Sequence, residues 1–164
     1  MTVEASGNQV SRGAGISIPP PIIYVGALAT GHLVNSFFPW TLLPAGARPT
    51  SAVVGWILVA AGTAFATLAA IELRRSRTPI TLNRPVKRLV TDGVYRRSRN
   101  PMYVSLGLIA IGVVLLWNMT WPLLALIGLF AVMNLWIVRS EERHLAARFG
   151  EEYDAYRRRV RRWL

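Results

Sequence analysis

Residues 101–138 read PMYVSLGLIAIGVVLLWNMTWPLLALIGLFAVMNLWIV, and this stretch contains no charged side chain. It holds two apolar runs, residues 102–117 and 121–138, on either side of the short segment Asn118-Met119-Thr120. A helix crosses the hydrocarbon core of a bilayer with about 20 residues, within a range of about 17–25. The stretch therefore predicts a helical hairpin in a membrane, with a tight turn in the middle and a slightly short first helix.

Two further apolar runs precede the hairpin, at residues 22–40 and 51–71, and Arg48 is the only charged residue between positions 22 and 71. We therefore predict an all-α membrane protein with four transmembrane helices. In the second run Gly62, Ala66 and Ala70 recur every four residues and so share one helix face. Small residues let membrane helices pack closely, and this face would serve contacts within the chain or in a homodimer.

The basic residues are confined to the ends of these runs. The 164-residue chain has 19 Lys and Arg against 8 Asp and Glu, a net charge of +11, and seventeen of the nineteen lie in residues 72–100 or 139–164. Because cytoplasmic loops of membrane proteins are rich in Lys and Arg, we expect loop 72–100 and both termini to be cytoplasmic in a multi-pass protein. The predicted division is a flexible N-terminal arm (1–21), two transmembrane helices (22–71), and a core of loop, hairpin and amphipathic tail (72–164).

Composition excludes several classes of protein. Hydrophobic residues make up 52% of the chain and charged residues only 16%, which is too apolar for a disordered protein. The chain has no cysteine, so it is not a disulfide scaffold. The arginines flank apolar runs instead of covering a polar fold, which argues against a nucleic-acid partner. The expected partners are membrane lipids and a lipophilic substrate.

Three polar residues fall inside the apolar runs. They are His32 and Asn35 in the first run and Asn134 in the fourth. Such residues bond to a neighbouring helix or line a cavity, and we favour the interhelical hydrogen bond. His32 has no Cys, second His or carboxylate near it in the sequence, so no metal site is predicted.

The loop and the tail carry the candidate chemistry. Asn100-Pro101 predicts an extended residue followed by the first turn of a helix, so Arg99 and Asn100 stand at a helix N-terminus, which favours an anion. Glu141 and Glu142 follow the fourth run among many arginines. They either neutralise these arginines or bind a cation or an amine. From position 151 the tail predicts an amphipathic helix that lies on an anionic leaflet.

Two motifs in this order resemble a known family. The segments 89–95 (LVTDGVY) and 99–103 (RNPMY), followed by Glu141-Glu142 and by the tail segment 149–156 (FGEEYDAY), are similar to integral-membrane methyltransferases. These are the isoprenylcysteine carboxyl methyltransferase and phospholipid N-methyltransferase group. The best-known members have Arg-His-Pro where this chain has Arg99-Asn100-Pro101, and Asn keeps hydrogen bonding without titrating near neutral pH.

The resemblance implies S-adenosylmethionine as methyl donor and residues 72–164 as a methyltransferase-like core. A basic helix N-terminus suits its carboxylate, acidic residues its ammonium, and tyrosines its adenine or sulfonium. The cofactor-binding residues expected on this basis are Tyr95, Arg99, Asn100, Pro101, Tyr103, Glu141 and Glu142.

The acceptor is expected to enter from the bilayer, and the motifs leave open whether its oxygen, nitrogen or sulfur is methylated. Arg139 or Arg143 would position an anionic acceptor, and Glu142 or His144 would take the proton from an amine. The alternative is a non-enzymatic membrane scaffold or subunit that binds anionic lipid through its basic cytoplasmic face.

Overall fold

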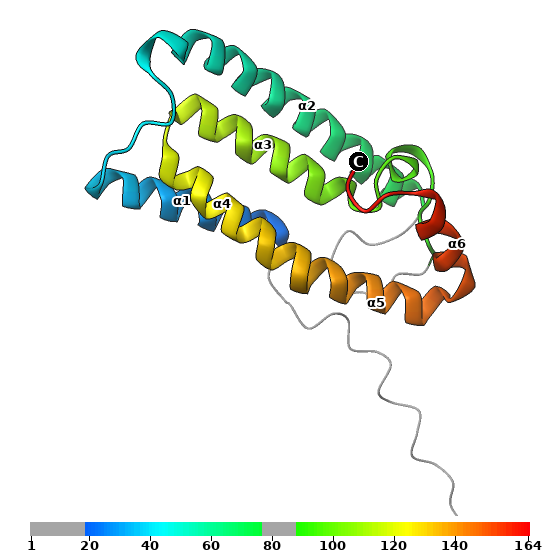
Figure 1. Ribbon diagram of the computed structural model, residues 1–164. Helices are drawn as coiled ribbons and strands as arrows, with labels where there is room; N and C mark the ends of the chain where they lie inside the picture. The colour runs from blue at the N-terminus through cyan, green and yellow to red at the C-terminus, as the bar shows by residue number, and fades with distance from the viewer. Residues whose placement is uncertain (1–18, 77–87) are drawn as a thin grey trace, which may run out of the picture.

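A computed structural model describes residues 19–76 and 88–164 (Figure 1). The regular elements of these residues are all helical, and an isolated bridge between Thr41 and Met119 is the one strand-like pairing among them. The prediction of an all-α protein is confirmed. The α-helices are α1 (Pro20–Phe37), α2 (Arg48–Arg75), α3 (Pro101–Trp117), α4 (Thr120–Val132), α5 (Val138–Phe149) and α6 (Glu151–Arg159), and the short elements are η1 (Ala45–Ala47), η2 (Gly93–Arg96) and η3 (Met133–Ile137).

The predicted fourth run is part of one long helix. α4, η3 and α5 follow each other without a break over Thr120–Phe149, as Figure 1 shows. η3 is a π-helical segment, and such insertions change the register of the side chains that follow. The apolar first half of this helix therefore continues directly into a polar second half, which holds Glu141 and Glu142.

The helices pack in two pairs, α2 along α3 and α1 along α4. Glycines allow the first pair to approach closely, because a Cβ atom on Gly112 would lie 2.6 Å from the carbonyl oxygen of Gly55. Gly62 is also buried, and a Cβ atom on it would lie 2.8 Å from the Cγ1 atom of Ile109. Part of the predicted small-residue face thus packs within the chain, and the homodimer stays a prediction.

Two helices among the described residues are long and apolar enough to cross a membrane, Ala45–Arg75 and Thr120–Phe149. α3 is apolar but has only 17 residues. α1 does not meet the same criterion, since its 18 residues include two prolines, His32 and Asn35. Two of the four predicted spans are therefore candidate membrane spans by length and composition, and the arrangement with four spans stays a prediction. Large apolar side chains project outward from three helices, as expected for a lipid-facing surface; examples are Val25, Trp56 and Trp136, which are 64%, 64% and 71% exposed.

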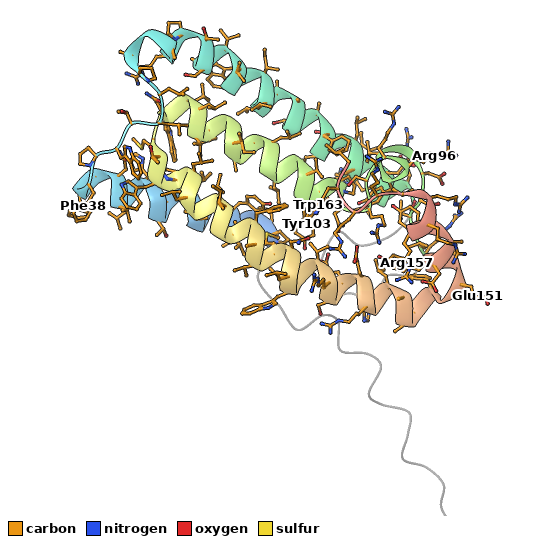
Figure 2. All side chains as sticks on the ribbon, viewed as in Figure 1. Phe38, Arg96, Tyr103, Glu151, Arg157 and Trp163 are labelled. Atoms are coloured by element: carbon orange, nitrogen blue, oxygen red, sulfur yellow. The ribbon has the colours of Figure 1, made fainter. Side chains whose placement is uncertain are left out.

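The end of the molecule with the α3–α4 turn is closed by local contacts. Asn118 ends α3 with φ of 54°, and its side chain bonds twice to Leu43: its Oδ1 accepts from the Leu43 N–H at 2.9 Å and its Nδ2 donates to the Leu43 carbonyl at 3.0 Å. The rings of Trp40 and Trp121 pack edge to face at this end. Figure 2 shows Phe38 at this apolar end, and Arg96, Arg157 and Glu151 at the opposite one.

The three polar residues of the apolar runs make ordinary structural contacts. His32 packs against Trp117 with ring centroids 5.0 Å apart. The Asn35 Oδ1 accepts a hydrogen bond from the Trp40 N–H at 3.2 Å, and Asn134 bonds to Arg162. Neither hydrogen bond joins two apolar helices, because Trp40 closely follows α1 and Arg162 lies after α6; the predicted interhelical bonds are therefore not found among the described residues, and His32 makes an aromatic contact instead.

Candidate active site

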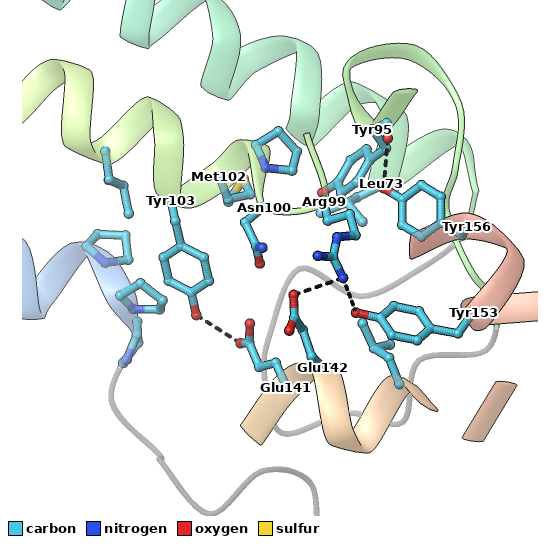
Figure 3. Close-up of a pocket in the computed structure, with 16 residues that line it drawn as sticks. Leu73, Tyr95, Arg99, Asn100, Met102, Tyr103, Glu141, Glu142, Tyr153 and Tyr156 are labelled. Atoms are coloured by element: carbon cyan, nitrogen blue, oxygen red, sulfur yellow. Dashed lines mark hydrogen bonds and ion pairs between the residues drawn. The ribbon is translucent and has the colours of Figure 1, made fainter. Parts of the chain in front are cut away.

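A cavity of about 400 Å³ lies where α3 begins, between that helix, α5, α6, η2 and the start of α1 (Figure 3). This volume falls within the about 300–1,000 Å³ of typical small-molecule sites. The cavity is lined by Pro19, Pro20, Pro21, Leu73, Tyr95, Arg99, Asn100, Pro101, Met102, Tyr103, Leu106, Glu141, Glu142, Leu145, Tyr153 and Tyr156.

The loop that leads into α3 is fixed to the tail. Gly93 opens η2 with φ of 58°, a conformation that glycine adopts without strain. The Tyr156 hydroxyl donates to the Tyr95 carbonyl at 2.7 Å, and Tyr153 and Tyr156 are nearly inaccessible to solvent. Burial raises the pKa of Tyr95 and Tyr156, so both phenols stay uncharged at neutral pH and serve as donors or aromatic surfaces.

Glu141 presents a carboxylate to the cavity. It lies beyond the apolar residues 121–138, and its Oε1 accepts a hydrogen bond from the Tyr103 hydroxyl at 2.9 Å. The pKa of Glu141 is raised to about 7, chiefly by burial; the hydrogen bond from Tyr103 opposes this shift and the charge of Glu142 adds to it. A cationic group in the cavity would favour the ionised form, because an opposite charge lowers the pKa of an acid.

Glu142 is enclosed by two arginines. The Arg162 Nε donates to its Oε1 at 3.0 Å and the Arg162 Nη2 to its Oε2 at 2.7 Å, which is the bidentate geometry that guanidinium groups favour. Arg99 contacts Oε1 through Nη1 at 3.0 Å and reaches the Tyr153 hydroxyl at 3.3 Å. One carboxylate therefore faces two guanidinium groups, and the trio has a net positive charge.

Arg99 keeps unused hydrogen-bonding capacity. Its Nε is buried and has no hydrogen-bond partner among the described residues. A buried polar atom without a partner costs free energy, and because this nitrogen is inaccessible to solvent, a ligand would have to bond to the outer nitrogens of the guanidinium. Arg99 also lines the cavity, which makes an anion or a carboxylate the natural occupant.

Asn100 precedes α3 and is held in place by hydrogen bonds. Its backbone N–H donates to the Ser98 Oγ at 3.1 Å, and its Nδ2 donates to the Arg162 carbonyl at 3.1 Å. Ser98 is fully buried. The amide of Asn100 thus has a fixed position at the helix N-terminus, where the free N–H groups of the first turn point out of α3.

The structure brings together all seven residues predicted for the cofactor: Tyr95, Arg99, Asn100, Pro101, Tyr103, Glu141 and Glu142 line one cavity. It does not bring Arg139 and Arg143 to it. Both are exposed on another face of the helix that carries Glu141. Among residues 19–76 and 88–164, no three His, Asp or Glu side chains gather as a metal site.

Two parts of the site were not predicted from the sequence. Pro19–Pro21 were assigned to the N-terminal arm, yet they line the cavity; residues 1–18 of that arm lie outside the described residues, as do residues 77–87 of the loop. Arg162 was missed because it is one of several arginines in the tail. Tyr153 and Tyr156 had a detectable signal, since they fall in the quoted tail motif and on its apolar face.

These observations define a class of protein: a helical membrane protein whose polar end holds a cavity with a carboxylate, a guanidinium and aromatic surfaces. The profile of the phospholipid methyltransferase family matches residues 50–152. Since this is more than half of the chain, the protein belongs to the phospholipid methyltransferase family. Its membership and its two candidate spans place it in a membrane.

Two relatives are similar to part of the chain. An uncharacterized protein of Haemophilus influenzae is 38% identical over 63 residues, which cover 38% of this chain and the full relative. The protein-S-isoprenylcysteine O-methyltransferase of Schizosaccharomyces pombe is 38% identical over 73 residues, which cover 44% of this chain and 30% of the relative. No solved structure matches. The resemblance to the isoprenylcysteine and phospholipid methyltransferase group is confirmed.

Proposed function

We propose that the protein moves a methyl group from S-adenosylmethionine to a lipophilic acceptor that is reached from the bilayer. The observation that carries this proposal is the juxtaposition of the Glu141 carboxylate and the partly unpaired Arg99 in one cavity. The donor has an ammonium and a carboxylate on one carbon atom, and these two side chains offer the complementary charges. A family of methyltransferases makes this donor the natural occupant.

Each charged residue has a distinct proposed role toward the donor. Glu141 binds the ammonium, Arg99 binds the carboxylate, and Asn100 holds the start of α3 in position. Tyr95 and Tyr153 supply aromatic surfaces for the adenine or the sulfonium. Glu142 is already bonded to two arginines, so its proposed role is to orient Arg99; those bonds argue against the alternative role of a general base.

Part of the cavity wall is apolar and suits an apolar acceptor. It includes Pro19–Pro21 at the start of α1 and Met102 and Leu106 of α3. The prolines have no backbone N–H, so this wall offers few hydrogen-bond donors. We propose that α1 and α3 cross the membrane beside the two candidate spans, with the cavity at the cytoplasmic end, so that the acceptor enters between helices at the boundary of the bilayer.

The donor supplies an electrophilic methyl group, which leaves the sulfur as the acceptor atom attacks in line; the leaving thioether is S-adenosylhomocysteine. The chain contributes alignment of the two reactants and exclusion of water, which together supply most of the acceleration in such displacements. Arg139 and Arg143 lie outside the cavity, so their predicted role with an anionic acceptor requires that acceptor to reach the exposed face of α5.

Calorimetry with S-adenosylhomocysteine tests the proposal on protein purified in detergent. Glu141→Gln removes the charge that pairs with the ammonium, and we expect binding to weaken by about tenfold or more, the equivalent of about 1.4 kcal/mol. The matched control is Glu151→Gln, which neutralises an exposed acid at the start of α6 and should leave binding unchanged. Wild-type protein that binds anionic vesicles but no S-adenosylhomocysteine would favour the lipid-binding scaffold instead.

A further inference from the structure

The five residues after α6 run back toward the start of α3 (Figure 1). Figure 2 shows Trp163 near Tyr103. We call residues 160–164 the strap. The profile of the family ends at residue 152, so the strap lies beyond the part of the chain that family membership explains.

Backbone and aromatic contacts fix the strap in place. The Arg161 carbonyl accepts from the Arg99 N–H at 3.0 Å. The Arg162 carbonyl accepts from the Ser98 Oγ at 3.3 Å and from the Asn100 Nδ2 at 3.1 Å. On its other side the Trp163 ring packs against Phe130 with centroids 5.1 Å apart. The strap therefore joins the loop before α3 to the long helix that carries Glu141 and Glu142.

The Arg162 side chain touches two polar groups of that long helix. It bonds to both oxygens of Glu142, and its Nη1 donates to the Asn134 Oδ1 at 3.3 Å. Asn134 lies in the π-helical segment η3. This segment changes the direction in which the following side chains point, and the Asn134 Oδ1 accepts a hydrogen bond from Arg162 there. Arg162 itself does not line the cavity, but it bonds to Glu142 and Asn100, which do.

The geometry points to Arg162 as a positioning residue that keeps Arg99 available for the donor carboxylate. A carboxylate has two oxygens, and Arg162 bonds to both of those on Glu142. Arg99 is thereby limited to one shared contact with Oε1, and its Nε stays without a partner among the described residues. Without the Arg162 guanidinium, Glu142 would offer both oxygens to Arg99, and this bidentate pair would compete with the ligand.

This inference rests on the proposed function and makes an unusual prediction for paired variants. Arg162→Gln should weaken S-adenosylhomocysteine binding by about tenfold, because Glu142 then withdraws Arg99 from the cavity. Adding Glu142→Gln removes the competitor, so the double variant should bind more tightly than Arg162→Gln alone. A purely structural role also predicts some recovery of stability in the double variant, because removing both partners leaves no uncompensated buried charge; the positioning role predicts in addition that Kd changes without a parallel change in melting temperature.

The experiment measures Kd by calorimetry for the wild type, both single variants and the double variant in the same detergent. Arg158→Gln is the control, because it removes an exposed charge of α6 and should leave Kd unchanged. Arg162→Lys should fall between the wild type and Arg162→Gln, since an ammonium cannot make the bidentate contact. Melting temperatures are measured alongside to show that each variant is folded.

Two outcomes would overturn the inference. Unchanged affinity in Arg162→Gln would show that Arg162 does not control Arg99, while the proposed function would stand. A double variant that binds no more tightly than Arg162→Gln, or a loss of affinity that follows the melting temperature across all variants, would show that Glu142 does not withdraw Arg99 from the cavity. Failure of the wild type to bind S-adenosylhomocysteine would contradict the proposed function itself and the inference with it.

Discussion

The two ends of α3 each carry an asparagine, and the two side chains are used differently. Asn118 lies at the end of α3 that leads into the turn to α4, and both polar atoms of its side-chain amide bond to the backbone of Leu43. Asn100 stands at the cavity, where its Nδ2 is bonded to Arg162 and its Oδ1 has no partner among the described residues. The comparison teaches that hydrogen bonds are satisfied at the structural end, whereas the functional end keeps unused capacity for a ligand.

Exchanging each asparagine for alanine tests this difference most strongly. Asn118→Ala removes two hydrogen bonds at a buried residue and places alanine at φ of 54°, so we expect a loss of about 2–3 kcal/mol of stability. Thermal unfolding in detergent measures it, and binding of S-adenosylhomocysteine by the folded variant should persist.

Asn118→Gly separates the two causes, because glycine tolerates the left-handed conformation but lacks the side chain. Asn100→Ala should show the reverse pattern, with a smaller change in melting temperature and a weaker Kd. If Asn100→Ala cost more stability than Asn118→Ala and left Kd unchanged, the contrast between the two ends would be wrong.

The next largest effect is expected at Arg99. Arg99→Lys keeps the charge but loses the planar fork that contacts Glu142, Tyr153 and a ligand carboxylate together. We expect Kd for S-adenosylhomocysteine to rise by about tenfold. Arg96→Lys is the control, since Arg96 is exposed and its ion pair among the described residues is with Asp92, at 3.6 Å. Equal effects of the two substitutions would point to general electrostatics instead of a specific site.

The smallest effect concerns pH. Glu141 has a pKa of about 7 because of burial, so the proton leaves and the carboxylate gains its charge as the pH rises through 7. Affinity for the ammonium should therefore increase between pH 6 and 7, and it should decline only at the alkaline pH where the ligand amine loses its own proton. Calorimetry across this range checks the profile, and Glu141→Gln should abolish the rising part. A rise that persists in Glu141→Gln would assign the titration to another group.

Part of this fold was predictable from local sequence. The uncharged stretch 101–138 defined the hairpin, and the Asn-Pro pair located the start of α3. The cavity residues were predictable because they lie in two compact motifs at the cytoplasmic ends predicted for the hairpin. The division into arm, helices and core, and the orientation in the membrane, stay predictions.

Other features depend on contacts that local sequence does not encode. Arg162 and Asn100 are 62 positions apart, and nothing in an arginine-rich tail distinguishes the one arginine that turns inward. The bonding of Glu142 to two guanidinium groups also follows from tertiary structure, which is why its carboxylate was predicted as a base. Pro19–Pro21 reach the cavity only because α1 packs along α4.

The most direct test of the central claim is an experimental structure of the protein with S-adenosylhomocysteine bound. We predict that the ligand lies in the cavity at the start of α3, with its ammonium on Glu141 and its carboxylate on Arg99. A ligand bound elsewhere, or in this cavity with neither group touching those two side chains, would contradict the account.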